Sequence, residues 1–154
     1  MTLCQLIKSS LILPRDKCTS KDELIAKLVE LIYTTESELP SQSKDDVLRT
    51  INIREQIGGT TLPSGLSVPH ARLRDYEGFI LAFGIPAEPL VHENIQIRLM
   101  ALMLTSQSGA PWFLPVLAEL TKLSRDSGFI TRLFEAENPE AFIEILKERD
   151  PELL

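Results

Sequence analysis

Cysteines and long apolar runs are scarce in this sequence, and both scarcities exclude classes of protein. The two cysteines, Cys4 and Cys18, have neither the number nor the spacing of a zinc site or a disulfide framework. We therefore expect two reduced thiols and no bound metal. No segment approaches the roughly 20 apolar residues of a membrane span, and residues 1–13 lack the pattern of a cleavable leader. These absences predict a cytoplasmic protein that does not insert into a membrane.

Basic residues and familiar catalytic motifs are also few. The 16 Lys and Arg residues are outnumbered by 22 Asp and Glu residues, and the resulting charge of -6 argues against a nucleic-acid-binding surface. An acidic protein is better suited to a basic partner. The sequence has no Gly-x-Ser-x-Gly elbow, no Walker loop, no Gly-x-Gly-x-x-Gly turn and no His-Glu-x-x-His pattern. Neither a hydrolase site nor a cofactor is therefore indicated.

The length and the apolar patterning predict one folded domain over residues 1–154, because the chain is too short for two typical cores. Apolar residues at helical spacing behind capping residues predict helices at 19–34, 43–57, 111–123, 126–134 and 138–146. Shorter apolar runs predict strands at 11–13, 66–73, 79–85 and 98–105. We predict an α/β fold of the α+β kind, with a small mixed β-sheet flanked by helices on both faces.

One of the two histidines, His70, has the surroundings of a phosphate site. The proline before it is tolerated in a strand only at an edge or an end, which places His70 near the surface. A phosphorylated imidazole needs backbone N–H groups, hydroxyls or a guanidinium around its oxygens. The glycine- and threonine-rich loop at 58–65 could supply the first two, and Arg54 or Arg72 the third. These residues alone leave a structural or merely exposed His70 open, and we expect His92 to be an ordinary exposed histidine.

The segment from Arg54 to Arg72 also carries a wider resemblance. It reads Arg-Glu-Gln-Ile-Gly-Gly-Thr-Thr-Leu-Pro-Ser-Gly-Leu-Ser-Val-Pro-His-Ala-Arg. This pattern resembles the signature of enzyme IIA domains of the fructose/mannitol type in the bacterial phosphotransferase system, including their nitrogen-regulatory branch. Residues 11–32 and 104–146 are similar to the opening and the end of the same family, so the resemblance covers nearly the whole chain.

The resemblance implies a role for each matching residue. His70 would receive a phosphoryl group from a histidine-containing phosphocarrier protein and donate it to a cysteine of an enzyme IIB. Arg54 matches the family's active-site arginine, which would stabilise the phosphoryl group during transfer. Thr60 and Thr61 fall where the family often has Ser-Thr, and we expect them to orient the imidazole or to contact phosphate oxygens. Arg72 is a further candidate for phosphate support.

One position departs from the family's pattern. Many members carry a second histidine at the start of the helix that follows residue 109, and the matching residue here is Phe113. A phenyl ring cannot hydrogen-bond phosphate, so we expect slower transfer or a substitute group. Trp112 and Phe113 are candidates for an apolar surface that contacts a partner, with a core role as the alternative.

Two functions are compatible with these residues. The leading hypothesis is a phosphocarrier that meets an enzyme IIB or a regulatory target in trans; the missing second histidine and the absence of recognisable carrier or IIB segments favour regulation over sugar transport. The alternative is a regulatory module that keeps the fold and controls a partner protein by direct binding, without efficient transfer. Uptake of phosphate from the carrier protein distinguishes the two.

Overall fold

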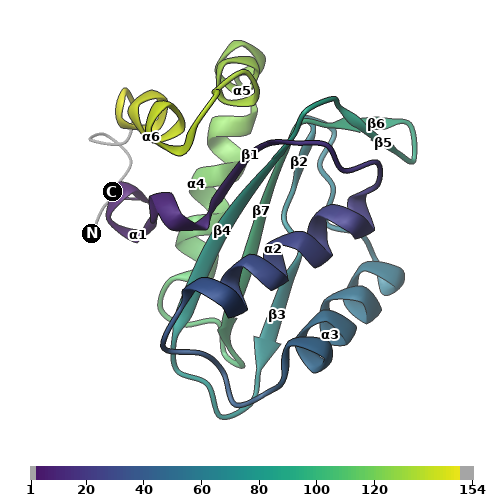
Figure 1. The fold of residues 1–154 in the computed structure, drawn as a ribbon, viewed down its shortest axis with the longest axis vertical. Coiled ribbons are helices and arrows are strands. Elements are labelled where there is room, and N and C mark those ends of the chain that lie inside the picture. Colours follow the sequence, from purple (N-terminus) through teal and green to yellow (C-terminus); the bar gives the residue numbers. More distant parts are fainter. Residues whose placement is uncertain (1–2, 150–154) are drawn as a thin grey trace.

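A five-stranded mixed sheet forms the centre of the computed structural model, which describes residues 3–149 (Figure 1). Its strands are β1 (Ile12–Asp16), β2 (Leu66–Ser67), β3 (His70–Leu73), β4 (Phe79–Pro86) and β7 (Leu99–Ser106). Strands β4 and β7 pair antiparallel in the middle of the sheet, and β1 pairs in parallel with β4. On the other side β2 and β3 both pair in parallel with β7. The strand that begins with His70 is thus at an edge, as the proline before it predicts.

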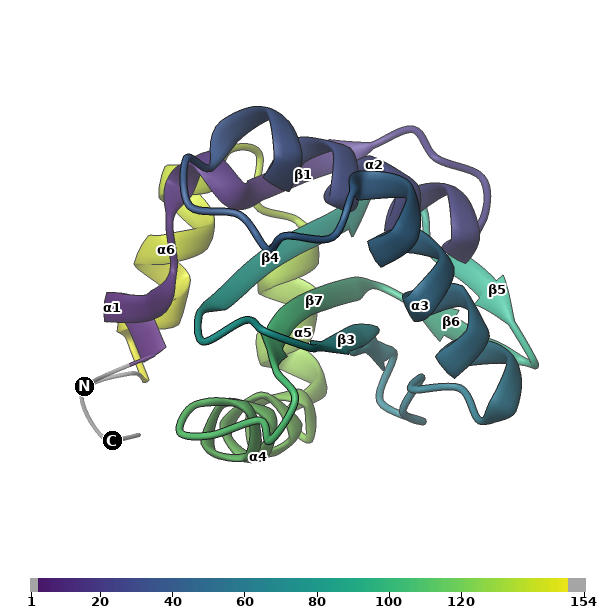
Figure 2. The same ribbon diagram turned by 90° about the horizontal axis from the view of Figure 1, so that it is seen from below.

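Helices cover both faces of this sheet, which confirms the predicted fold class (Figures 1 and 2). One face carries α2 (Lys21–Thr35) and α3 (Lys44–Ile57). The other face carries α4 (Phe113–Ser124), α5 (Ser127–Phe134) and α6 (Pro139–Lys147), with the short α1 (Leu3–Leu6) and a 3₁₀ turn at Ser9–Leu11 beside α6. Among the described residues, no helix combines the length and the apolar character needed to cross a membrane.

Two apolar cores lie on opposite sides of the sheet because the side chains of its central strands alternate. On β7, Met100, Leu102 and Leu104 pack with the core under α2 and α3. The intervening residues of β7, Leu99, Ala101 and Met103, pack with the core under α4, α5 and α6. Both sets are buried. A strand that is covered on both faces explains the continuous apolar run seen in the sequence.

The predicted helix starts are confirmed by their capping hydrogen bonds. The side chains of Ser20, Ser43, Asp126 and Asn138 each accept a hydrogen bond from the backbone N–H three residues later. The helix predicted at 111–123 instead begins at Phe113, without a side-chain cap. Its first turn is preceded by Gly109, whose φ of +79° turns the chain in a way that favours glycine.

Three elements differ from the sequence prediction. The strand predicted at 66–73 is split into β2 and β3 at Pro69, which has no N–H for the ladder, so that Val68 and Pro69 lie in neither strand. A hairpin of β5 (Leu90–His92) and β6 (Ile95–Ile97) lies between the strands predicted at 79–85 and 98–105 and was not predicted. It turns at Glu93 and Asn94, which both have positive φ, a requirement of tight hairpin turns. Helix α1 was not predicted, because one turn gives no periodic pattern.

Cys18 is a buried free thiol, in line with the expectation of a reduced cysteine. Burial raises the pKa of this thiol to about 11, and the nearby Asp16 carboxylate acts in the same direction. The thiol is therefore protonated and unreactive at neutral pH. The side chain of Cys4 lies outside the described part of the chain.

Candidate functional site

His70 begins β3 and is half-buried. Its ring nitrogen Nδ1 lies 3.1 Å from the carbonyl oxygen of Val68. A carbonyl oxygen can only accept a hydrogen bond, so the proton of the neutral ring is on Nδ1. The lone pair of the ring is then on Nε2, which makes Nε2 the nucleophilic atom.

The surroundings of His70 keep its ring uncharged. Burial lowers the pKa of His70 below its ordinary value of 6.5, and the positive charges of Arg54 and Arg72 act in the same direction. The hydrogen bond to Val68 and the charge of Glu55 oppose this shift without reversing it. At neutral pH the imidazole is therefore a neutral base with a free lone pair.

This shift predicts the response of His70 to pH. An NMR titration of the ring is expected to give a midpoint below 6.5, because charging the half-buried ring is unfavourable. The unfolded chain takes up its proton first as pH falls through 6.5, so His70 makes folding less favourable in that range and has no effect above it. A midpoint at or above 6.5 would contradict the assigned environment.

Arg54 lies in the last turn of α3, which packs against β3. Its side chain folds back over the helix end and donates a 2.6 Å hydrogen bond from Nη1 to the carbonyl oxygen of Gly58. A cation at a helix C-terminus is favourable, since carbonyl groups there lack partners within the helix. This bond uses one of the five guanidinium N–H donors, so the exposed head can still bind an anion.

A buried ion pair holds the loop in front of His70. Lys21 Nζ lies 2.9 Å from Glu55 Oε1, and only 6% and 5% of the two side chains are exposed. The hydroxyl of Thr60 donates a 2.7 Å hydrogen bond to the other carboxylate oxygen of Glu55. The carbonyl of Thr60 accepts from the N–H of Val68, the residue whose own carbonyl holds His70. A chain of polar contacts therefore runs from α2 to the imidazole.

Thr60 and Thr61 both support the loop geometry. The proton of Thr60 is already donated to Glu55, so this hydroxyl has none left for a phosphate oxygen. Thr61 forms an antiparallel bridge with Ser67, and their hydroxyl oxygens lie 3.5 Å apart. On the other side of the loop, the hydroxyl of Ser64 donates to Ser124 Oγ on α4 at 2.9 Å.

Phe113 is 3% exposed and belongs to the core under α4, which agrees with the core alternative and not with an exposed apolar surface. Its ring lies against His70, with 4.7 Å between the ring centroids. The guanidinium carbon of Arg72 lies 4.8 Å from the centroid of the same phenyl ring. Trp112 is half-buried and packs against the same core, with part of its side chain at the surface.

His92 also differs from the prediction, since it is half-buried rather than simply exposed. Its Nε2 lies 3.3 Å from Lys21 Nζ and accepts a hydrogen bond from that ammonium. Sequence reasoning missed Lys21 as a partner of Glu55 and His92. These residues are 34 and 71 positions from Lys21, and only the packing of α2, α3 and the β5–β6 hairpin brings them together.

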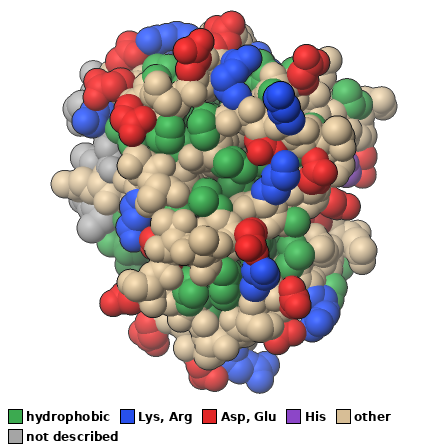
Figure 3. Space-filling view, in the orientation of Figure 1, with side chains coloured by type: hydrophobic (Ala, Val, Ile, Leu, Met, Phe, Trp, Pro, Cys, Tyr) green, Lys and Arg blue, Asp and Glu red, His purple; other side chains and the backbone are tan. Residues whose placement is uncertain are grey.

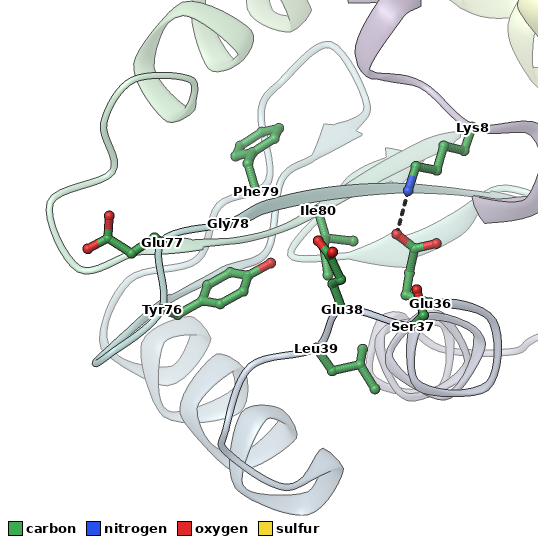
Figure 4. A pocket seen from close by; sticks show the side chains of 10 residues that line it. All are labelled: Lys8, Glu36, Ser37, Glu38, Leu39, Tyr76, Glu77, Gly78, Phe79 and Ile80. Atoms are coloured by element: carbon green, nitrogen blue, oxygen red, sulfur yellow. Dashed lines mark hydrogen bonds and ion pairs between the residues drawn. The ribbon is translucent and has the colours of Figure 1, made fainter.

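A surface cavity that does not include His70 has a different lining. A cavity of about 430 Å³ is lined by acidic and aromatic side chains, including Glu36, Glu38 and Tyr76 (Figure 4). Burial raises the pKa of Tyr76 to about 12, and nearby carboxylates add to this effect. Lys8 pairs with Glu36 at 2.7 Å. Within residues 3–149, no group of three or more His, Cys, Asp and Glu side chains is placed to hold a metal ion.

Charges of both signs are intermixed on the face that carries α2 and α3, and no large basic patch is visible there (Figure 3). A surface of this kind lacks the dense positive charge that phosphate backbones need. The charges that act on the His70 ring are instead those of three nearby residues, Arg54, Arg72 and Glu55.

Comparison with known proteins assigns the family. Residues 5–149 match the family model described as phosphoenolpyruvate-dependent sugar phosphotransferase system, EIIA 2. This chain belongs to that EIIA 2 family. Members of the family carry a phosphohistidine, so the EIIA 2 domain described here is a phosphocarrier-type domain of that system, as the sequence predicts.

Individual relatives agree with this assignment. The EIIA 2 domain is 25% identical over 149 residues to the nitrogen regulatory protein of Bradyrhizobium diazoefficiens, covering 95% of each chain. The nitrogen regulatory protein IIA-Ntr of Neisseria meningitidis has a similar structure, with a TM-score of 0.75, 23% identity and coverage of 94% of this chain and 98% of that one. The IIA-mannitol enzyme of Escherichia coli, in a complex with phosphorylated IIB-mannitol, aligns with a TM-score of 0.72 at 18% identity, covering 93% and 98% of the two chains.

Proposed function

We propose that His70 of this EIIA 2 domain accepts a phosphoryl group on Nε2 from a histidine-containing phosphocarrier protein and passes it to a partner. The observation that carries the proposal is the hydrogen bond from Nδ1 to the carbonyl of Val68, in a ring that is neutral at physiological pH. It leaves Nε2 as the single free nucleophile of the half-buried ring.

The transfer is a displacement at phosphorus. The lone pair of His70 Nε2 forms the new N–P bond while the bond to the ring nitrogen of the donor breaks, and that electron pair returns to the donor imidazole. The His70 ring gains positive charge in this step, and the carbonyl of Val68 stabilises it through the Nδ1 proton. In onward transfer to a cysteine of a partner, the thiolate sulfur would bond to phosphorus while the N–P bond to Nε2 breaks. The electron pair of that bond would return to the imidazole, which becomes neutral again.

Three further residues support this reaction. The exposed guanidinium of Arg54, whose charge reaches His70, would bind the equatorial oxygens of the transferring group. Thr60 and Thr61 would act through the loop, by fixing the position of Val68 rather than by contact with phosphate. Glu55, held by Lys21, in turn fixes Thr60. The loop in front of His70 is therefore preorganised before a phosphoryl group binds.

Exposed apolar side chains on the elements that surround His70 suggest where the donor docks. On α3, Ile53 and Ile57 are 51% and 79% exposed and lie one helical turn apart, beside Arg54. On α4, Leu114 is 66% exposed and follows Phe113, with Trp112 before it. Apolar side chains at the centre of an interface commonly dominate its binding energy. We propose that Ile53, Ile57, Leu114 and the surface part of Trp112 contact the phosphocarrier protein.

The docking proposal predicts that Ile57→Glu weakens binding of the carrier by about tenfold or more, since it places a charge in an apolar contact. The control is Val91→Glu, which changes an equally exposed residue (74%) on the β5–β6 hairpin instead of α3. Affinity is measured by NMR titration of the labelled carrier. Equal affinities for the two variants would move the docking site away from α3.

The carrier function is tested by incubating the protein with phosphoenolpyruvate, enzyme I and the phosphocarrier, and by measuring its intact mass. Wild type is expected to gain about 80 Da as an acid-labile group. The variant His92→Gln should gain the same mass, because His92 Nε2 is occupied by Lys21. The variant His70→Gln should gain none, and a phosphorylated His70→Gln protein would refute the assignment.

The destination of the phosphoryl group separates the two roles of the family. Similarity to a nitrogen regulatory protein over 95% of the chain supports a regulatory role, which we propose as the leading one. Rapid transfer to the cysteine of a dedicated IIB would instead support sugar transport. Burial of Phe113 at the phosphate site favours one alternative, a binding module without efficient transfer. Folded wild type that gains no mass from an active carrier would support that alternative.

A further inference from the structure

Arg72 and His70 project from the same face of β3. They are two residues apart on the strand, and Ala71 and Leu73 between and after them are buried on the opposite face, under α2 and α3. Phe113, at the start of α4, lies over both side chains, 4.7 Å from the imidazole and 4.8 Å from the guanidinium carbon. Imidazole, phenyl ring and guanidinium therefore form one contiguous group.

Among the described residues, the phenyl ring of Phe113 is the partner that holds the Arg72 guanidinium. Within residues 3–149, the side chain of Arg72 makes no hydrogen bond and no ion pair, although it is exposed and the protein is acidic overall. The electron-rich face of an aromatic ring attracts a cation without using any of its N–H groups. All five donors of Arg72 thus remain available next to His70.

Phe113 itself is held firmly. It is 3% exposed, its N–H donates a 2.9 Å hydrogen bond to the carbonyl of Gly109, and a Cβ added at that glycine would lie only 3.4 Å from Phe113 Cβ. A rigid ring of this kind can restrict a long and flexible side chain more effectively than a solvent-exposed group could. The Phe113 ring, at the start of α4, is thus a fixed aromatic surface, or seat, on which the Arg72 guanidinium rests.

We propose that Phe113 is a positioning residue that seats the Arg72 guanidinium beside His70, so that Arg72 binds the phosphoryl oxygens on Nε2. This inference rests on the proposed function, because it assigns a second phosphate-binding cation to the same site. The two arginines come from different elements, Arg54 from α3 and Arg72 from β3.

The first test uses phosphoramidate, which phosphorylates histidine chemically and needs no carrier protein. The pKa of the phosphoryl group on His70 is read from a ³¹P NMR titration. A neighbouring cation favours the dianion, so Arg72→Ala should raise this pKa by roughly one unit, a tenfold change in proton affinity. Arg74→Ala, which removes another exposed arginine just beyond β3, should leave it unchanged. An equal pKa in wild type and Arg72→Ala would overturn the inference.

The second test asks whether Phe113 acts through Arg72. Arg72→Ala is expected to slow phosphoryl transfer from the carrier about 10- to 100-fold, and Arg72→Lys to restore part of it. Phe113→Leu keeps an apolar side chain and should slow transfer about two- to fivefold. In the Arg72→Ala background, Phe113→Leu should have no further effect. The same loss in both backgrounds would show that Phe113 acts by packing alone, and would overturn its role as a seat.

The two tests separate this inference from the carrier function. A wild-type protein that takes phosphate from phosphoramidate but not from the carrier would refute the proposed function, while the ³¹P titration would still decide the role of Arg72. A protein that accepts phosphate from the carrier at the same rate with and without Arg72 would refute only the inference.

Discussion

Replacement of Lys21 by methionine is expected to lower the free energy of unfolding by about 3–5 kcal/mol, because it leaves the buried carboxylate of Glu55 without its counter-ion. Lys21 and Glu55 lie 2.9 Å apart, and their side chains are 6% and 5% exposed. Removal of Lys21 leaves the Glu55 carboxylate without its charged partner at a site where little of its side chain meets solvent. The free energy of unfolding is measured by urea denaturation monitored by circular dichroism. The dependence of this free energy on urea concentration should be the same in wild type and variant if both unfold in the same way.

Lys27 offers a matched control on the same helix. It also pairs with a carboxylate, Asp16, at 2.8 Å, but 42% of its side chain is exposed. Lys27→Met should therefore lower the free energy of unfolding far less than Lys21→Met does. The double variant Lys21→Met/Glu55→Met should recover much of the loss, since it leaves no unpaired charge. A Lys21→Met protein as stable as Lys27→Met would contradict the assigned ion pair.

Replacement of Arg54 by alanine is expected to slow phosphoryl transfer to His70 about 10²- to 10³-fold, the cost of removing one preorganised donor to developing charge. Lysine at this position should recover only part of the rate, because it offers a point charge instead of a planar fork of donors. The rate is measured by rapid-quench transfer from the phosphorylated carrier protein under single-turnover conditions.

Arg49 provides the control for Arg54. It lies on the same helix, is exposed, and pairs with Asp46 at 2.7 Å through an i, i+3 contact. Arg49→Ala should transfer at the wild-type rate and should match Arg54→Ala in net charge, so that long-range steering is held constant. Equal slowing of both variants would mean that Arg54 acts only through the overall charge.

Sequence reasoning singled out His70 and predicted the sheet around it because the signals for both are local. The proline before His70 marks an edge strand, and the capping residues Ser20 and Ser43 mark the starts of α2 and α3. Continuous apolar runs mark β4 and β7. Each of these features depends on residues within a few positions of one another.

The supporting structure of the site was not predictable in the same way. The contacts of Lys21 with Glu55 and of His70 with Phe113 join residues 34 and 43 positions apart, and nothing in their local patterns pairs them. The sequence left Phe113 open between a partner-facing surface and the core, because a phenyl ring after a loop is compatible with both. Only the packing of α4 against β3 decided between them.

In the proposed reaction, Nε2 of His70 is the phosphoryl acceptor and Nδ1 keeps its proton for Val68. The most direct test is long-range ¹H–¹⁵N NMR of the ¹⁵N-labelled protein after phosphorylation, which reports each ring nitrogen separately. The structure predicts a phosphorus-coupled Nε2 and a protonated Nδ1 on His70. Phosphorus on Nδ1, or on any residue other than His70, would contradict the account.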